Sequence, residues 1–124
     1  MGPSGERSRG VPRTPLSLVA KIVAVVPDLM LASRVKESLT TAGHEVSITP
    51  TLPQSVEAEA IVCDLDAVDA KAIASQGIPT LGFYSHVDID TKARAQKAGI
   101  DLIVPRSRMS RELPQLVNGL LRNP

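Results

Sequence analysis

Polar residues follow four apolar segments of this chain, each at the point where the apolar segment ends. These polar residues are Asp28, Asp64, Asp66, Ser85 and Arg106. A carboxylate can act as a nucleophile or bind a metal ion, and a hydroxyl or a guanidinium can hold an oxyanion. In an open parallel sheet, the residues just past the carboxyl ends of the strands line the crevice where ligands bind. The function is therefore expected at that edge.

The apolar segments are predicted to be strands, with helices between them. The strands are expected at residues 21–26, 45–49, 60–63, 79–84 and 102–104. Asp28 and Ser110 are suited to cap helices, and Gly43 and Gly99 are suited to end them. Apolar residues at helical spacing place helices at 28–42, 67–76, 90–98 and from 110 onward, and the prolines of 50–53 place a loop there. Five strands alternating with five helices predict an α/β fold, a three-layer doubly wound sandwich around a five-stranded parallel sheet.

Composition and charge exclude several classes of function. The chain has 124 residues and a formal net charge of +1, which gives no reason to expect a nucleic-acid or membrane partner. No export signal or membrane span is recognised. The single cysteine, Cys63, fits a reducing, cytoplasmic setting and should be buried and inert. Residues 1–18, rich in Gly, Pro, Ser and Arg, are expected to be a disordered tail before one domain at 19–124.

With these strand ends in order, residues 20–122 resemble the receiver domain of bacterial response regulators. The similarity rests on a strand ending in Asp64, a strand ending in Ser85, and the segment 98–104 leading to Arg106. The resemblance implies strand order 2-1-3-4-5 and a two-component signalling module that is not an enzyme. It also implies that Asp64 is the phosphoacceptor candidate, with Ser85 and Arg106 as candidates for the phosphate pocket.

The sequence departs from the receiver pattern at the metal site. The acidic pair that holds magnesium in the family falls on Val26 and Pro27, which cannot supply the hard oxygen ligands that magnesium needs. The remaining metal candidates, all weak, are Asp28, Asp64 and Asp66. No cofactor is therefore expected, with magnesium as the alternative. Arg106 takes the place of the family's lysine, and the aromatic position of the fifth strand is Ile103.

Each candidate also has a purely structural interpretation. Asp64 could solvate a loop, or cap the helix that starts at Ala67 together with Asp66. Asp28 is favoured as an N-cap over a metal ligand, although the two roles can coexist. Ser85 could bind an oxyanion or satisfy backbone groups of its turn.

His86 and most of the basic cluster of Arg106, Arg108 and Arg111 are expected to be ordinary surface features. His86 has no second His or Cys at ligand spacing, and His44 lies on a different loop. Arg108 and Arg111 are expected in a solvated turn, whereas Arg106 should face the crevice.

Three hypotheses about function follow. The leading one is a degenerate receiver-like module that acts through a protein partner on the last two helices and the fifth strand, without magnesium-dependent phosphorylation. A homodimer is an alternative use of the same kind of contact. The second hypothesis is a working phosphoacceptor receiver that uses Asp64. The third is a flavodoxin-like ligand-binding or enzymatic domain that shares only the topology.

Overall fold

The computed structural model describes residues 20–85 and 89–122. The elements within these ranges are β1 (Lys21–Val25), α1 (Leu29–Thr41), β2 (Glu45–Thr49), β3 (Ala60–Asp64), α2 (Ala70–Ala74), β4 (Thr80–Tyr84), α3 (Ile89–Ala98), β5 (Leu102–Pro105) and α4 (Arg106–Arg122). None of the helices in these ranges is long and apolar enough to cross a membrane. The predicted tail at 1–18 and His86 lie outside the described residues.

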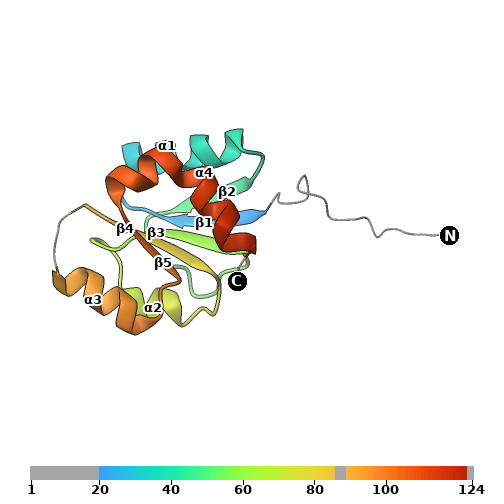
Figure 1. The fold of residues 1–124 in the computed structure, drawn as a ribbon. Helices are drawn as coiled ribbons and strands as arrows, with labels where there is room; N and C mark the ends of the chain where they lie inside the picture. Colours follow the sequence, from blue (N-terminus) through green and yellow to red (C-terminus); the bar gives the residue numbers. More distant parts are fainter. Residues whose placement is uncertain (1–19, 86–88, 123–124) are drawn as a thin grey trace.

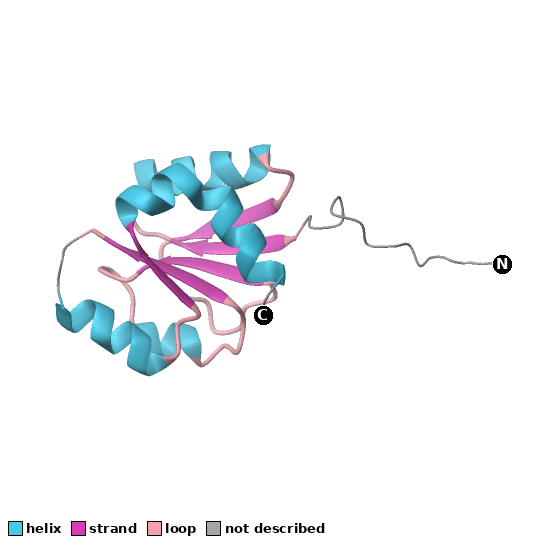
Figure 2. Cartoon of the chain, viewed as in Figure 1, coloured by secondary structure: helices cyan, strands magenta, loops and turns pink. Residues whose placement is uncertain are grey.

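The strands form one parallel sheet in the order β2-β1-β3-β4-β5, which confirms the predicted topology. Parallel neighbours require crossover connections, and these carry helices onto both faces of the sheet. Helices α1 and α4 cover one face, and α2 and α3 cover the other (Figure 1). Figure 2 shows the resulting three layers, with the strands between two layers of helix. β2 and β5 are the edge strands.

The core is divided by the sheet into two clusters, and β3 contributes to both. Residues 60–63 of β3 are fully buried, as expected for a central strand with helices over both faces. Ala60 and Val62 pack on the side of α1 and α4, whereas Ile61 and Cys63 pack on the side of α2 and α3. This alternation follows from the two-residue period of a strand. The apolar run that the sequence assigned to a buried strand is therefore used on both faces.

The segment between β2 and β3 contains no helix in the structure, although every residue of 50–59 is described, so the prediction of five helices is wrong. Pro50 and Pro53 interrupt the segment, and proline removes a backbone donor that a helix needs. Leu52 and Val56 still pack against the core on the side of α2 and α3. Two apolar residues are too few for the continuous stripe that stabilises an amphipathic helix.

Helix α2 begins at Ala70, later than the predicted start at Ala67. The side chain of Asp69 caps it by accepting a hydrogen bond from the N–H of Lys71 at 3.1 Å. The interpretation that Asp64 caps this helix is therefore wrong. The residues between β3 and Asp69 form turns instead of a first helical turn.

Helix α4 begins at Arg106, earlier than the predicted N-cap at Ser110. A kink at Glu112, where φ is −124° and ψ is 15°, divides the helix into two parts. Pro114 lies just beyond the kink, and its missing N–H leaves one bond to the preceding turn unmade. The second part carries the predicted apolar stripe, whose buried members are Leu113, Leu116, Val117 and Leu120.

Gly99 directly follows α3, and Gly43 follows Ala42, the C-cap of α1, so both glycines end helices as predicted. Their φ angles are 99° and 96°, in the left-handed region that side chains other than glycine rarely adopt. Each glycine turns the chain from a helix toward the next strand. The two turns thereby set where β2 and β5 begin.

Candidate functional site

The predicted site residues lie along the carboxyl-terminal edge of the sheet. Asp64 ends β3 and is opposite Phe83 of β4 in the strand register, while the last residue of β4 is opposite the last residue of β5. Ser85 and Arg106 directly follow β4 and β5, and Asp28 stands between β1 and α1. The carboxyl ends of the strands therefore deliver these polar side chains to one edge, as the sequence predicted.

Asp28 is the N-cap of α1. Its side-chain oxygen accepts a hydrogen bond from the N–H of Leu31 at 3.0 Å, and its backbone is extended with φ −72° and ψ 116°. The N-cap prediction is confirmed. Val26 is buried in the core beneath α1 and α4, and Pro27 is exposed. Neither of these two residues brings a side-chain oxygen to the site.

Asp64 is partly buried at the end of β3. Its Oδ1 accepts the N–H of Asp66 at 2.9 Å, which closes a local turn. Burial raises the pKa of the Asp64 carboxyl above its usual range, although the bond from the Asp66 N–H opposes this change. The Asp66 carboxylate raises the pKa further, the Arg106 guanidinium lowers it, and the Asp28 carboxylate raises it. The charges of Asp66, Arg106 and Asp28 therefore all act on the Asp64 carboxyl.

The Asp66 carboxylate binds Ser85. Its Oδ2 accepts hydrogen bonds from both the backbone N–H and the hydroxyl of Ser85, each at 2.7 Å. These are two of the donors that an oxyanion at Ser85 would use. Sequence reasoning missed this contact, because Asp66 was considered only as a cap or a weak metal ligand. The only signal was its position two residues after the end of β3, beside the strand that precedes Ser85.

Leu65 holds the loop that carries both carboxylates against β4. Its N–H donates to the carbonyl of Phe83 at 2.8 Å, and its side chain is buried. A Cβ atom at Gly82 would lie 2.8 Å from Cγ and Cδ1 of Leu65. The absence of a side chain at Gly82 therefore allows Leu65 to pack directly on the strand. This packing fixes the positions of Asp64 and Asp66 on either side of it.

Arg106 directly follows β5 at this edge of the sheet, and it is exposed at the start of α4. Its guanidinium is near enough to lower the pKa of Asp64. Arg108 and Arg111 instead pair with Glu112 of the same helix, at 3.5 Å and 3.7 Å. These exposed pairs contribute little to stability. The three arginines are therefore not equivalent, as the sequence predicted.

The three weak metal candidates each have a hydrogen-bonding role in the fold. Among residues 20–85 and 89–122, no group of three or more His, Cys, Asp or Glu side chains is placed to hold a metal ion. Their oxygens serve the fold instead: Asp28 caps a helix, Asp64 closes a turn, and Asp66 binds Ser85.

Cys63 is fully buried next to the site. Burial raises the pKa of its thiol to about 12, and the neighbouring Asp64 carboxylate raises it as well. The reactive thiolate is therefore scarce at neutral pH. The prediction of a buried, inert cysteine is confirmed for its burial and supported for its reactivity.

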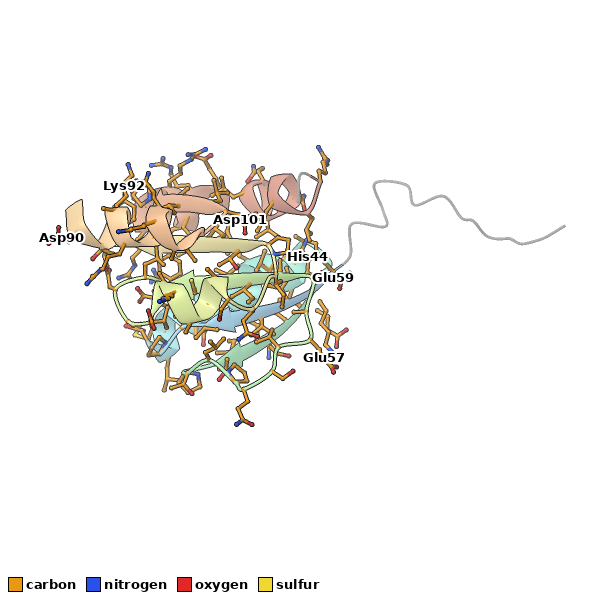
Figure 3. All side chains as sticks on the ribbon, turned by 90° about the horizontal axis from the view of Figure 1, so that it is seen from below. His44, Glu57, Glu59, Asp90, Lys92 and Asp101 are labelled. Carbon is orange, nitrogen blue, oxygen red and sulfur yellow. The ribbon has the colours of Figure 1, made fainter. Side chains whose placement is uncertain are left out.

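His44 is a buried connection that sequence reasoning did not identify. Its Nδ1 accepts the N–H of Ala20 at 3.0 Å, so Nε2 carries the proton that is shared with Oδ1 of Asn118 at 3.3 Å. The ring thereby links the start of β1 to α4. It lies at the end of the domain away from Asp90, the second residue of α3 (Figure 3). His44 is thus a structural residue rather than part of the site.

No protein-family model matches the sequence, and no curated protein matches it. Several solved structures, however, match the fold of this chain. The receiver domain of the Francisella response regulator 1452 is 18% identical, with a TM-score of 0.68 over 83% of this chain and 97% of that one. A CheY-like response regulator receiver domain protein from Methanospirillum hungatei JF-1 is 16% identical, with a TM-score of 0.72 over 84% and 94%.

A putative response regulator from Chloroflexus aurantiacus J-10-fl is 20% identical, with a TM-score of 0.69 over 85% of this chain and 99% of that one. Identities this low carry no residue roles from one protein to another. The similarity covers nearly all the described residues and therefore establishes the fold.

Proposed function

We propose that this chain, whose fold is that of response-regulator receiver domains, is a degenerate receiver that signals through protein contacts without magnesium-dependent phosphorylation. The observation that carries the proposal is the pair of 2.7 Å hydrogen bonds from Ser85 to the Asp66 carboxylate. A phosphoryl group on Asp64 would have to displace another anion to reach these donors. Breaking two charge-assisted hydrogen bonds makes that exchange unfavourable.

The arrangement of charge near Asp64 supports the same conclusion. Asp28 and Asp66 are both close enough to raise its pKa, and Arg106 is the cation that opposes them. Phosphoryl transfer adds negative charge, which a metal ion neutralises in enzymes and receivers that catalyse it. Val26 and Pro27 supply no ligand for such an ion. Transfer to Asp64 would therefore place further negative charge among carboxylates.

A working phosphoacceptor receiver is the second candidate, and one observation favours it. Asp64 ends a central strand at the edge where ligands bind, and the Arg106 guanidinium lies near enough to affect its carboxyl. An arginine there could pair with a phosphoryl oxygen. The two candidates differ in whether Asp64 takes up a phosphoryl group.

We expect the protein partner to bind the face formed by α3, β5 and α4. β5 is an edge strand, and Pro105 and Arg106 at its end are exposed. The adjoining turn of α4 adds the exposed guanidinium of Arg111. A polar, positively charged rim of this kind suits a transient contact with another protein. Self-association through the same face is the alternative.

Titration with magnesium and beryllofluoride, followed by backbone NMR of the full chain, tests the proposal. We expect no localised shifts at Asp64, Ser85 or Arg106, and no phosphoryl adduct by mass spectrometry after incubation with acetyl phosphate and magnesium. Localised shifts, together with an adduct that Asp64→Asn abolishes, would overturn the proposal in favour of the second candidate.

An Asp66→Ala variant tests the observation itself. Removing the carboxylate should shift the backbone amide resonance of Ser85 in the absence of any ligand, because that amide loses its acceptor. Asp69→Asn is the matched control, since it changes a carboxylate of the same loop and keeps an oxygen for the cap of α2. An unchanged Ser85 resonance in Asp66→Ala would remove the basis of the proposal.

A further inference from the structure

A groove of about 720 Å³ lies between α2 and α3. Its lining residues are Leu65, Asp66, Ala67, Val68, Asp69, Ala70, Lys71, Thr91, Arg94, Lys97 and Ala98. The groove follows from the late start of α2, because the residues before Ala70 form turns where a first helical turn would pack against α3. The lining from Thr91 to Ala98 covers roughly 10 Å of the α3 axis.

The interior of the groove is apolar. Leu65 is buried, and Val68, Ala70 and Ala98 are partly buried. These side chains are small or branched and leave room for an incoming apolar side chain. The volume lies within the range of about 300–1,000 Å³ that is typical of ligand-binding pockets. The groove can therefore accept apolar groups from a binding partner.

The rim of the groove carries exposed cations from both helices. Lys71 lies on α2, and Arg94 and Lys97 lie on α3. Among the described residues, no salt bridge involves these three side chains. Arg94 makes one long hydrogen bond, 3.4 Å, to the hydroxyl of Thr91. Their charges are therefore available to a negatively charged partner.

The two carboxylates of the lining are already used within the fold. Asp66 accepts both donors of Ser85, and Asp69 accepts the N–H of Lys71. They reduce the positive potential of the groove without cancelling it, because the cations of the lining outnumber them. A ligand that places negative charge beside α3 is thus favoured over a cationic one.

We propose that this groove binds an acidic, amphipathic segment of a partner protein. The apolar side chains of that segment would pack against Val68 and Ala98, and its carboxylates would pair with Arg94 and Lys97. A segment fits better than a small anion, because the cations are spread along two helices around an apolar interior and do not converge on one point. The basic N-terminal sequence of this chain, with Arg7, is an unsuitable occupant because its charge has the same sign.

The groove does not depend on the proposed function. It lies between α2 and α3, whereas the proposed partner face lies between α3 and α4, on the other side of α3. Binding to the groove requires neither magnesium nor a phosphoryl donor. The two proposals can therefore fail separately.

Fluorescence anisotropy with the full chain and a labelled peptide of roughly a dozen residues tests the proposal. The peptide contains Glu, Leu and Ala at helical spacing, and a second peptide has Lys in place of each Glu. We expect the acidic peptide to bind, with affinity that falls as salt rises, and the basic peptide not to bind. The Arg94→Glu, Lys97→Glu double variant should bind the acidic peptide roughly tenfold more weakly, or weaker still.

Lys92→Glu is the matched control for these charge reversals. Lys92 is an exposed cation of the same helix that does not line the groove, and it lies on the side of α3 turned away from α2 (Figure 3). The control should bind the acidic peptide nearly as tightly as the unchanged protein does. Only a small loss of affinity is expected from the change in net charge. Amide shifts caused by the peptide should cluster at 65–71 and 91–98.

Three outcomes would overturn the proposal: no binding of the acidic peptide, an equal loss in Lys92→Glu, or shifts that map to α4 and β5. Inorganic phosphate that produced the same shifts as the peptide would reassign the groove to a small anion. Concentration-dependent shifts at 65–71 and 91–98 without peptide would assign the groove to a second copy of the chain. Either reassignment would also contradict the proposal.

Discussion

Asp64 and Asp66 lie two residues apart and differ in what surrounds them. Asp64 is partly buried with a raised pKa, whereas Asp66 is exposed and engages both donors of Ser85. The predicted phosphoacceptor candidate therefore lies two residues from a carboxylate that engages Ser85, itself a predicted candidate for the phosphate pocket. At the scale of single residues, the balance between these two carboxylates determines what the site can do.

The raised pKa of Asp64 predicts a pH-dependent effect of Asp64→Asn on stability. The folded state binds the Asp64 proton more tightly than the unfolded state does, so ionisation lowers stability as pH rises through the folded pKa. The free-energy cost of the charge is fully present above that pKa and absent below the unfolded value of about 3.9. Asp64→Asn should therefore raise the free energy of unfolding at pH 7, and this gain should disappear in acid.

Urea denaturation at neutral pH and near pH 3, below the unfolded pKa of Asp, measures this difference. Asparagine keeps the side-chain oxygen that accepts the Asp66 N–H, so the turn survives the substitution. Glu57→Gln changes an exposed carboxylate on the loop before β3 and should have little effect at either pH. A loss of stability in Asp64→Asn at pH 7 would show that the charged form is held favourably.

At the scale of elements, the short α2 and the glycine in β4 have linked consequences. The loop from β3 to α2 is held by Leu65, which packs on Gly82 and places Asp66 within reach of Ser85. The late start of α2 at Ala70 then leaves the groove beside α3. One loop therefore shapes both the candidate site and the proposed binding groove.

Gly82→Ala should destabilise the protein by about 1–3 kcal/mol, because the new Cβ would be within 2.8 Å of Leu65. Combining it with Leu65→Ala should cost less than the sum of the two single changes, since the smaller side chain removes the clash. Chemical denaturation of the four proteins gives this coupling. The Ser85 amide should also shift in Gly82→Ala, because the loop must move.

Gly119→Ala provides the control for the glycine substitution. A Cβ at Gly119 meets no atom within 4 Å, and alanine favours a helix by about 1 kcal/mol relative to glycine. This variant should be neutral or stabilised. Equal destabilisation of Gly82→Ala and Gly119→Ala would contradict the packing argument.

At the scale of the whole molecule, the described residues form a core in two parts. Two apolar clusters lie on either side of one sheet, and both are built from residues between Ala20 and Leu121. Shared strands join the clusters, so the sheet and its helices should unfold together. The stability of the domain is expected to reside in these residues.

Deleting residues 1–18 should leave the free energy of unfolding unchanged within about 0.5 kcal/mol, because a segment rich in Gly, Pro, Ser and Arg has little apolar surface to bury. Amide spectra of the shortened and full-length chains should overlay for residues 20–122. A further deletion through Ala24 removes most of β1 and should prevent folding, because β1 pairs with both β2 and β3. A large loss in the shorter deletion would mean that the first residues contribute to the core.

The resemblance to receiver domains supplied the order of the strands. The sequence by itself determined the strands and the edge at which polar residues meet. These follow from local patterns: apolar runs such as 60–63 can be satisfied only by burial, and a polar residue after each run must lie at a strand end. The N-cap at Asp28 was also predictable, because its partner is only three residues away. The loop at 50–53 was predicted from its two prolines, whereas the stated count of five helices was wrong.

Only the tertiary structure decided how Asp66 and Ser85 interact and where the groove opens. The two residues are 19 positions apart, and their contact depends on the packing of Leu65 against Gly82. A local pattern cannot reveal such a contact, because nothing in the sequence near Asp66 indicates which strand end its side chain will face. The groove likewise arises from the late start of α2 beside α3, a relation between elements that neither sequence segment contains.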